Sequence, residues 1–244
     1  MTLRAELCHT SKASLKTIHP RVSVCLPVAP VDRHHLWFAL QHLPTHCDEV
    51  IILLDRGHGS WKHHIAEAFE TVFQHASGDV LLSYATDMLV SPHLVEVGLQ
   101  YIQEGYDLVS FQYRDYTLNK HCQWHETYMN LLRKLPFLYR CKLGKWSGLF
   151  MMTREVWETI HYQDTPSPDL QFFTACAEHG FTHKYVSSLR NYHLRSGTHH
   201  TKQVQQGRTR ALLQVHPLKV IAHSLLYLKP YLLIGYLREI CGSS

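Results

Sequence analysis

Short apolar stretches alternate along the chain with segments of helical spacing. Five of the stretches are rich in β-branched or large apolar residues and end at glycine, proline or charged residues, which predicts buried strands. They are Arg21–Val28, Asp48–Asp55, Val80–Tyr84, Asp107–Gln112 and Phe181–Val186. We expect the last of them to be a short edge strand.

The segments that follow these stretches favour helices, because apolar residues recur on one face and capping residues stand in front of them. The expected helices are Asp32–Leu43, Ser60–His75, Pro92–Glu104, Thr153–Ile160 and Pro168–Gly180. Ser91 and Ser167 are N-cap candidates, each followed by a proline that suits a first helical turn. Strands that alternate with helices predict an α/β fold, with a mostly parallel sheet covered by helices on both faces.

Two carboxylates follow the predicted strands at their carboxyl ends. Asp55 ends the second strand, and Asp87 follows Val80–Tyr84 after a short turn. Right-handed crossovers place both residues at the same edge of the sheet, which is the edge where open α/β sheets bind ligands. The alternative for Asp87 is a purely local role in a turn or a cap.

Composition indicates one large globular domain with a small appendage. The 244 residues are 45% hydrophobic and 18% charged, which provides ample material for a core. We expect a flexible tail over residues 1–20, a domain over 21–212 and an amphipathic helical segment over 213–244. Seven scattered cysteines without a CxxC pair, and no apolar leader, favour a reducing, cytoplasmic location.

Positive charge is concentrated in the last quarter of the chain. From Lys184 onward there are nine Lys/Arg residues and one acid, Glu239, which gives a net charge of +8. Such a segment favours an anionic partner, which is a substrate phosphate, an anionic membrane or nucleic acid. Nucleic acid is not expected as a partner, because the chain contains no recognisable nucleic-acid-binding motif.

The stretch Pro217–Ile240 is nearly long enough to span a bilayer, but Lys229 stands near its centre. The insertion cost of about 2.5–3.5 kcal/mol for a central lysine cancels most of the gain from the leucines. We therefore expect a helical hairpin or bent helix that contacts the cytoplasmic face of a membrane peripherally. The alternative is a cap that packs on the main domain, or a contact between subunits.

In their order along the chain, several segments resemble the family 2 glycosyltransferases of the GT-A, Rossmann-like fold, which use nucleotide-activated sugars. VSVCLPV is similar to the family's opening strand, and EVIILLDRGHGS to its strand that ends in an aspartate and a Gly/Ser loop. ASGDVLLSYATD resembles the strand that leads to the metal-binding Asp-x-Asp. SGLFMMTREVW, PDLQFFTACAEHGFTHKYV and NYHLRSGT resemble the acceptor-site segment, the helix with the base, and a late histidine followed by a polar loop.

The resemblance implies an inverting transfer from a nucleotide-diphospho-sugar to an acceptor hydroxyl of a glycan, lipid phosphate or protein. It implies Asp169 as general base, and Asp87 with His193 as ligands of Mg2+ or Mn2+. The residues that it places at the nucleotide-sugar donor are Pro27, Asp55, Asp79, Thr86, Gly148, Arg195 and Arg208. For Asp79, a structural turn is the alternative. The basic stretch from Arg195 to Arg210 is expected to be a loop that closes over the phosphates.

This sequence departs from the family pattern at two motif positions. Ala85 stands where the first aspartate of Asp-x-Asp is expected, and Pro168 precedes Asp169 where the family has a glutamate. The segment Gly57–Ser77 is also too short for a strand that many members carry there. These departures leave open an alternative function, a catalytically inactive GT-A domain that serves as a binding subunit.

Overall fold

The computed structural model describes residues 7–11, 20–54, 65–115, 127–128, 147–163, 165, 168–194, 200–212 and 214–242. The chain divides into two compact units. The first comprises Met1–Arg114 with Tyr139–Leu194, and the second comprises Asp115–Leu138 with Arg195–Ser244.

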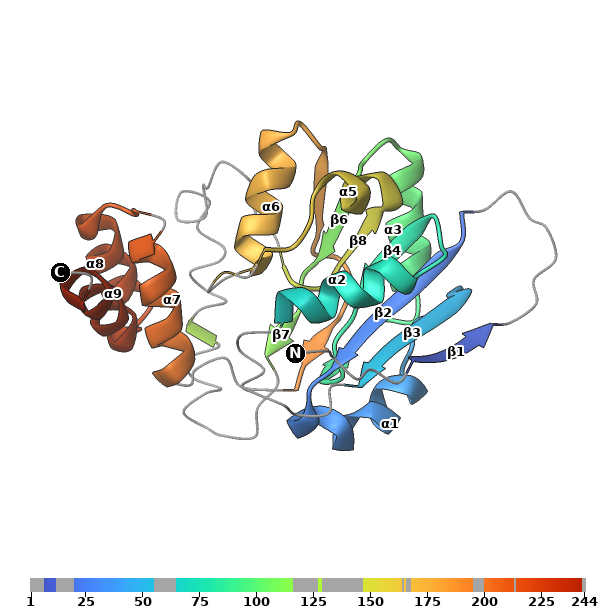
Figure 1. The fold of residues 1–244 in the computed structure, drawn as a ribbon, viewed down its shortest axis with the longest axis horizontal. Helices are drawn as coiled ribbons and strands as arrows, with labels where there is room; N and C mark the ends of the chain where they lie inside the picture. The colour runs from blue at the N-terminus through green and yellow to red at the C-terminus, as the bar shows by residue number, and fades with distance from the viewer. Residues whose placement is uncertain are drawn as a thin grey trace. The chain divides into compact units, whose positions relative to one another are not determined.

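The first unit is built on a mixed sheet with the strand order β1-β3-β2-β4-β8-β6-β9 (Figure 1). Its strands are β1 (Leu7–Ser11), β2 (Val22–Val28), β3 (Glu49–Leu54), β4 (Val80–Ser83), β6 (Leu108–Phe111), β8 (Phe150–Thr153) and β9 (His183–Val186). The pairings give β2, β3, β4, β6 and β9 one direction, whereas β1 and β8 run the opposite way. The α/β class and the edge position of β9 are confirmed.

Helices cover both faces of this sheet, as expected. On one face, α1 (Arg33–Gln41) and α3 (Leu94–Gln103) contribute to a core that contains Val24, Leu82 and Met151. On the other, α2 (Ile65–His75), α5 (Arg154–Thr159) and α6 (Pro168–Glu178) pack around Phe73 and Phe172. Short elements complete the unit: the 3-10 helix η1 (Pro30–Asp32) and the strands β5 (Met88–Leu89), β7 (Arg114–Asp115) and β10 (Tyr192–His193).

Two local expectations differ from the structure. Part of the expected tail, Leu7–Ser11, forms β1 and pairs antiparallel with β3. A strand there covers the backbone of β3, which would otherwise be an open edge. The helix α3 begins at Leu94, with His93 as its N-cap, so Ser91 and Pro92 lie in the turn before it.

A buried polar network joins the strands at their amino ends. Glu49 accepts hydrogen bonds from the Ser23 hydroxyl and from the backbone and hydroxyl of Ser77. A Cβ on Gly78 would lie 2.6 Å from Ser23 Oγ, so only glycine fits this turn. The Arg154 guanidinium donates to the carbonyls of Ala76 and Gly78. The Ala-Ser-Gly-Asp motif therefore has a structural role. It joins the amino ends of the strands, whereas ligands are expected at their carboxyl ends.

The second unit is helical where it is described. It contains α7 (His200–Leu212), α8 (Pro217–Leu226) and α9 (Pro230–Gly242). A Cβ on Gly207 would lie 1.9 Å from the Leu232 carbonyl oxygen, and one on Gly235 would lie 2.0 Å from that of Val204. The backbones of α7 and α9 therefore touch at two glycines.

The expectation that the basic stretch through Arg210 forms a loop is wrong from His200 onward, because these residues form α7. Gly207, which suggested a loop, is instead the residue that the helix crossing requires. Through this packing α7 belongs, with α8 and α9, to the second compact unit. The predicted helical hairpin in Pro217–Ile240 is confirmed, with Leu228 at φ 51° in the turn before Pro230. None of the described helices has the length and apolar character that crossing a membrane requires.

Candidate functional site

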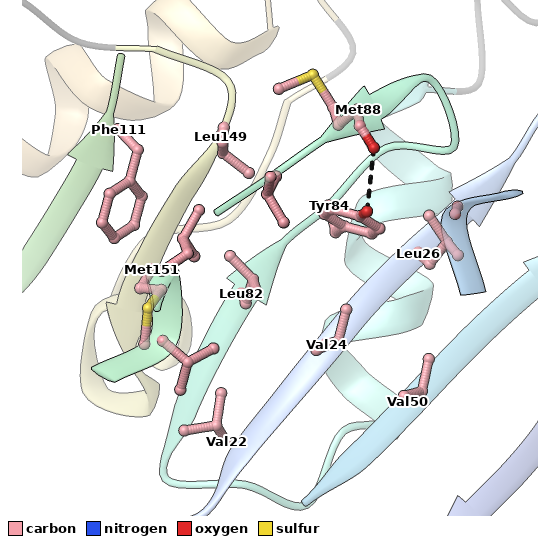
Figure 2. Close-up of a cluster of buried hydrophobic side chains, with 14 of the residues drawn as sticks. Val22, Val24, Leu26, Val50, Leu82, Tyr84, Met88, Phe111, Leu149 and Met151 are labelled. Atoms are coloured by element: carbon pink, nitrogen blue, oxygen red, sulfur yellow. Dashed lines mark hydrogen bonds between the residues drawn. The ribbon is translucent and has the colours of Figure 1, made fainter. Parts of the chain in front are cut away.

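The turn after β4 holds Asp87 at the carboxyl edge of the sheet. The Tyr84 ring is buried beneath this turn, and its hydroxyl donates to the Met88 carbonyl oxygen at 3.1 Å (Figure 2). The Met88 amide donates back to the Ala85 carbonyl at 3.2 Å, which closes the turn around Thr86 and Asp87. Burial, together with the negative charge of Asp87, raises the pKa of Tyr84, so this hydroxyl stays a hydrogen-bond donor. The turn is therefore anchored in the core.

The side chains of Asp87 and His193 are in direct contact. The distance from Asp87 Oδ2 to His193 Nε2 is 3.0 Å, and the two side chains are only 6% and 16% exposed. The pair arises because β5 and β10 run antiparallel, with His193 opposite Met88, and because the Leu194 amide donates to the Asp87 carbonyl at 2.8 Å. The two residues that the family resemblance implies as metal ligands are therefore in contact in the structure.

Asn191 fixes this approach of β10. Its side chain is buried and accepts a hydrogen bond from the Ser91 amide at 2.9 Å while it donates to the Gln112 carbonyl at 2.9 Å. Its own carbonyl accepts from the Arg114 amide. One side chain therefore joins the segments that follow β5 and β6 to β10, the strand that carries His193. The centroid of the His193 ring lies 5.4 Å from that of the Tyr113 ring.

The carboxylate oxygen of Asp87 and the imidazole nitrogen of His193 are suitable ligands for a divalent cation. A carboxylate oxygen is a hard ligand, and manganese also accepts an imidazole nitrogen. Neighbouring ligands in an octahedron of about 2.0–2.1 Å radius lie about 2.9 Å apart. The observed separation of 3.0 Å matches that value. Within the described residues there is no cluster of three or more His, Cys, Asp or Glu side chains, so a cation here would take its other ligands from substrate and water.

Asp169 and Gly148 form the second half of the candidate site. Asp169 lies in the first turn of α6, where the helix dipole favours a carboxylate. Its Oδ2 would lie 3.4 Å from a Cβ on Gly148, and its Oδ1 accepts a hydrogen bond from the Tyr162 hydroxyl at 3.4 Å. Burial, followed by the charge of Asp169, raises the pKa of Tyr162, so this group stays a phenol that donates.

The two halves meet at the carboxyl end of β4. Because β8 runs antiparallel to β4, the residues before β8 lie next to the end of β4. The Ser83 hydroxyl, on the last residue of β4, donates to the Gly148 carbonyl at 3.2 Å. Gly148 therefore lies beside the strand whose following turn carries Asp87.

The other predicted donor-site residues fall into four groups. Pro27 and Thr86 are buried near the carboxyl ends of β2 and β4, at the expected edge. Asp79 lies at the opposite edge, where its carboxylate accepts from the Arg21 amide at 2.8 Å, which supports its structural alternative. Arg208 belongs to α7 of the second unit and pairs with Glu239 at 2.6 Å. Asp55 and Arg195 lie outside the described residues.

Sequence reasoning missed Tyr84, Tyr162 and Asn191, which position the candidate site residues without being charged. The partners of Asn191 are distant in sequence, whereas Tyr84 and Tyr162 donate to nearby residues but carry no charge that would mark them. The one available clue was the combination of a tyrosine or asparagine with an otherwise apolar surrounding, since buried polar groups of this kind need a hydrogen-bond partner.

No protein-family model and no curated protein matches the chain. Solved structures do match it. A mannosyltransferase from Pyrobaculum calidifontis, in complex with GDP-Man and Mn2+, matches 93% of this chain and 76% of its own, with a TM-score of 0.60 and 14% identity. The chain has the GT-A fold. In this GT-A fold, the Asp87 and His193 pair and the Asp169 carboxylate lie at the carboxyl edge of the sheet.

Other solved structures agree with this assignment of fold. Glucosyl-3-phosphoglycerate synthase from Mycobacterium tuberculosis, in complex with Mn2+, UDP-glucose and phosphoglyceric acid, has a TM-score of 0.55 and 18% identity. The match covers 80% of this chain and 78% of that one. A structure described as a mycobacterial protein has a TM-score of 0.56 and 15% identity over 80% of this chain and 73% of its own. At such identities the likeness concerns the GT-A fold.

Proposed function

We propose that this protein is a glycosyltransferase that moves a sugar from a nucleotide-diphospho-sugar to an acceptor hydroxyl. The observation that carries the proposal is the buried Asp87 and His193 pair at the carboxyl end of β4 in a GT-A fold. The similar solved structures support it, since they were obtained with GDP-Man or UDP-glucose and with Mn2+.

Asp87 and His193 would hold Mg2+ or Mn2+ together with the donor diphosphate. When bound, the cation neutralises the charge that develops on the departing diphosphate. Asp87 supplies a fixed anionic oxygen, because Tyr84 and the pairing of β5 with β10 hold its turn in place. His193 supplies a nitrogen ligand or, when protonated, a direct partner for a phosphate oxygen.

Asp169 would act as the general base in an inverting reaction. The acceptor hydroxyl attacks the anomeric carbon from the side opposite the diphosphate, the bond to the diphosphate breaks, and the hydroxyl proton passes to Asp169. The hydrogen bond from Tyr162 holds Oδ1, which leaves Oδ2 on the side of Gly148. The absence of a side chain at Gly148 leaves space next to that oxygen for an acceptor.

A binding screen tests the function directly. UDP- and GDP-sugars are titrated into the protein with Mn2+, Mg2+ or a chelator, and the melting temperature is followed. A donor present at about 100 times its dissociation constant stabilises the fold by about 2.7 kcal/mol. We expect stabilisation that depends on the metal, followed by release of nucleoside diphosphate when an acceptor is added. Donor binding without any turnover would favour the inactive binding subunit, and the absence of binding to every donor would contradict both.

We also propose that the second unit contacts an anionic membrane surface peripherally. Its helices expose large apolar side chains at helical spacing, namely Leu218, Ile221 and Leu225 on α8 and Ile234, Leu237 and Ile240 on α9. The same helices carry lysine and arginine residues that anionic headgroups attract. This contact would bring the enzyme to a membrane-bound acceptor.

A further inference from the structure

A small hollow lies where the chain leaves β6 and β9 at the carboxyl edge of the sheet. Its volume is about 140 Å³, and its lining includes Gln112, Arg114, Ser187, Ser188, Arg190 and Tyr192. Pockets that hold whole drug-sized ligands usually measure about 300–1,000 Å³. This hollow therefore suits a single substituent of a larger ligand, about the size of a phosphate.

The hollow carries positive charge that the described residues do not neutralise. Arg114 and Arg190 both line it, and neither guanidinium forms an ion pair with a carboxylate in the part of the chain that the structure describes. Arginine is suited to phosphate because its planar N–H groups can donate two parallel hydrogen bonds. The hydroxyls of Ser187 and Ser188 add two neutral donors of the kind that often accompany such arginines.

The wall of the hollow is held rigid. Asn191 contributes to the lining, but both ends of its side-chain amide are used, one by the Ser91 amide and one by the Gln112 carbonyl. The Arg114 amide donates to the Asn191 carbonyl at 2.9 Å. The backbones that carry the two arginines are thus joined through one buried residue, so the hollow exists before any ligand arrives.

The hollow is next to the candidate site and on its acceptor side. Tyr192, which lines it, precedes His193 in β10, and His193 contacts Asp87. In the sheet order, β6 and β9 lie on one side of β4, whereas β2 and β3, where the nucleoside is expected, lie on the other. A group bound in the hollow would therefore lie on the side of β4 away from the expected nucleoside. It would belong to the acceptor and not to the donor.

We propose that this hollow, which we call the Arg114/Arg190 hollow, binds a phosphate group of the acceptor. The proposal rests on the proposed glycosyltransferase function, and it names the acceptor class as a phosphorylated compound. A soluble phosphomonoester and a lipid with a phosphomonoester headgroup present the same dianionic group to the two arginines.

Calorimetric titration of the full chain with inorganic phosphate and with glycerol phosphate tests the proposal. The titrations use the parent, Arg114→Gln, Arg190→Gln and the double variant at low ionic strength. The matched control is Arg21→Gln, because Arg21 is exposed and lies at the amino end of β2, at the opposite edge of the same sheet. Loss of either arginine should weaken binding about tenfold, as expected for a charge-assisted hydrogen bond, and Arg21→Gln should bind as the parent does.

The titrations are repeated with saturating UDP or GDP and Mn2+, which occupy the donor site. Phosphate binding that persists under these conditions and depends on Arg114 and Arg190 supports the proposal. Binding that nucleotide and metal abolish would assign the phosphate to the donor site and overturn it, as would equal binding by the parent and the double variant, or no binding at all. Failure of UDP and GDP to bind, with phosphate binding intact, would instead count against the proposed function alone.

Vesicles separate the two sources of phosphate. Parent and double variant are sedimented with phosphatidylcholine vesicles that contain phosphatidic acid or lack it. Sedimentation that needs both phosphatidic acid and the two arginines assigns the hollow to a lipid phosphate. Glycerol phosphate binding that needs the arginines, with equal sedimentation of parent and variant, assigns it to a soluble phosphomonoester.

Discussion

Asp87 Oδ2 and His193 Nε2 lie 3.0 Å apart although Asp87 follows β4 and His193 comes near the end of the first unit's sequence. The short antiparallel pairing of β5 with β10 brings them together, and the buried Asn191 side chain fixes β10 there. The proposed metal ligands are therefore brought together by backbone pairing between two strands.

Replacing Asp87 by asparagine should abolish metal-dependent donor binding while the protein stays folded. The amide keeps the size of the side chain and its ability to accept from His193, but it removes the charge that a cation requires. Calorimetry with UDP- or GDP-sugars and Mn2+ measures the loss. Asp79→Asn is the control, because Asp79 lies at the other end of β4. Parent-like donor and Mn2+ binding by Asp87→Asn would exclude this metal site.

Asp169→Asn should leave donor binding unchanged and lower kcat by about 10²–10⁴, the usual contribution of a positioned general base. Tyr162→Phe keeps the stacking of the ring on Phe172 but removes the hydroxyl that holds Asp169. We expect this variant to lower kcat by up to about tenfold, in line with the loss of one neutral hydrogen bond. If Asp169 only complements the helix dipole, its loss would cost about 0.3–1 kcal/mol of stability and leave turnover intact.

The buried Glu49 should make stability depend on pH at the acidic end. Burial alone would raise its pKa, but the hydrogen bonds from Ser23 and Ser77 outweigh it and hold the pKa of Glu49 below its ordinary value. The stabilisation is therefore fully present above the unfolded pKa of about 4.3 and is lost as the pH falls through the lower folded value. Glu49→Gln should destabilise the protein by about 1–3 kcal/mol at pH 7.

Urea unfolding at pH 7 and at about pH 3 measures this effect. The gap between the parent and Glu49→Gln should shrink at the lower pH, because the unfolded parent then binds a proton at Glu49 that the folded parent, with its lower pKa, takes up less readily. A gap of the same size at both values of pH would show that the charge of Glu49 contributes nothing.

Gly207→Ala should disrupt the crossing of α7 and α9. The new Cβ would lie 1.9 Å from the Leu232 carbonyl oxygen, so the two helices would have to separate, at a cost of at least about 1–3 kcal/mol. The control is Gly242→Ala in α9, where nothing lies within 4 Å of the new Cβ. Hydrogen exchange of the amides of α9 should accelerate in the first variant only. Equal protection in both variants would contradict the close approach.

Membrane contact through the second unit should be lost when charge is placed on its exposed apolar residues. In a triple variant, Leu218, Ile221 and Leu225 are each replaced by glutamate, which removes apolar area and adds repulsion from anionic lipid. Sedimentation with anionic vesicles should fall, while donor binding should not change. Trp37→Glu serves as the control, since Trp37 is 70% exposed in the first unit. Sedimentation of the triple variant at the parent level would contradict the membrane proposal.

Much of the fold follows from local pattern. The apolar run before Asp87 and the helix stripe through Phe69 and Val72 bury side chains that their spacing already marked. The direction of β8 was not predictable in the same way, because hydrophobic periodicity is the same for parallel and antiparallel strands. Nor was β1, since Leu7–Ser11 carries no strong apolar pattern and is ordered by the backbone of β3.

The candidate site could be predicted as far as its charged residues. Asp87, His193 and Asp169 were identified because a family motif retains them, and the structure places the first two in contact. Asn191, which supports His193, depends on contacts between distant segments that a single sequence does not reveal. Tyr162 lies close to Asp169 in the sequence, but an uncharged residue in an apolar segment gave no reason to single it out. The prediction of a loop where α7 lies was wrong for a related reason. In the sequence, a glycine that permits two helices to cross cannot be distinguished from one that ends a helix.

The reversed direction of β8 determines which connection can vary in this protein. In a parallel strand the residues after the strand reach the ligand edge, whereas here the residues before β8 do so, and Ser83 holds them at Gly148. An insertion or deletion ahead of Ser147 would therefore reshape the surroundings of Asp169 without passing through the turn that carries Asp87. Under the proposed function, changes in this connection would alter the acceptor side of the site and leave the Asp87 turn unchanged.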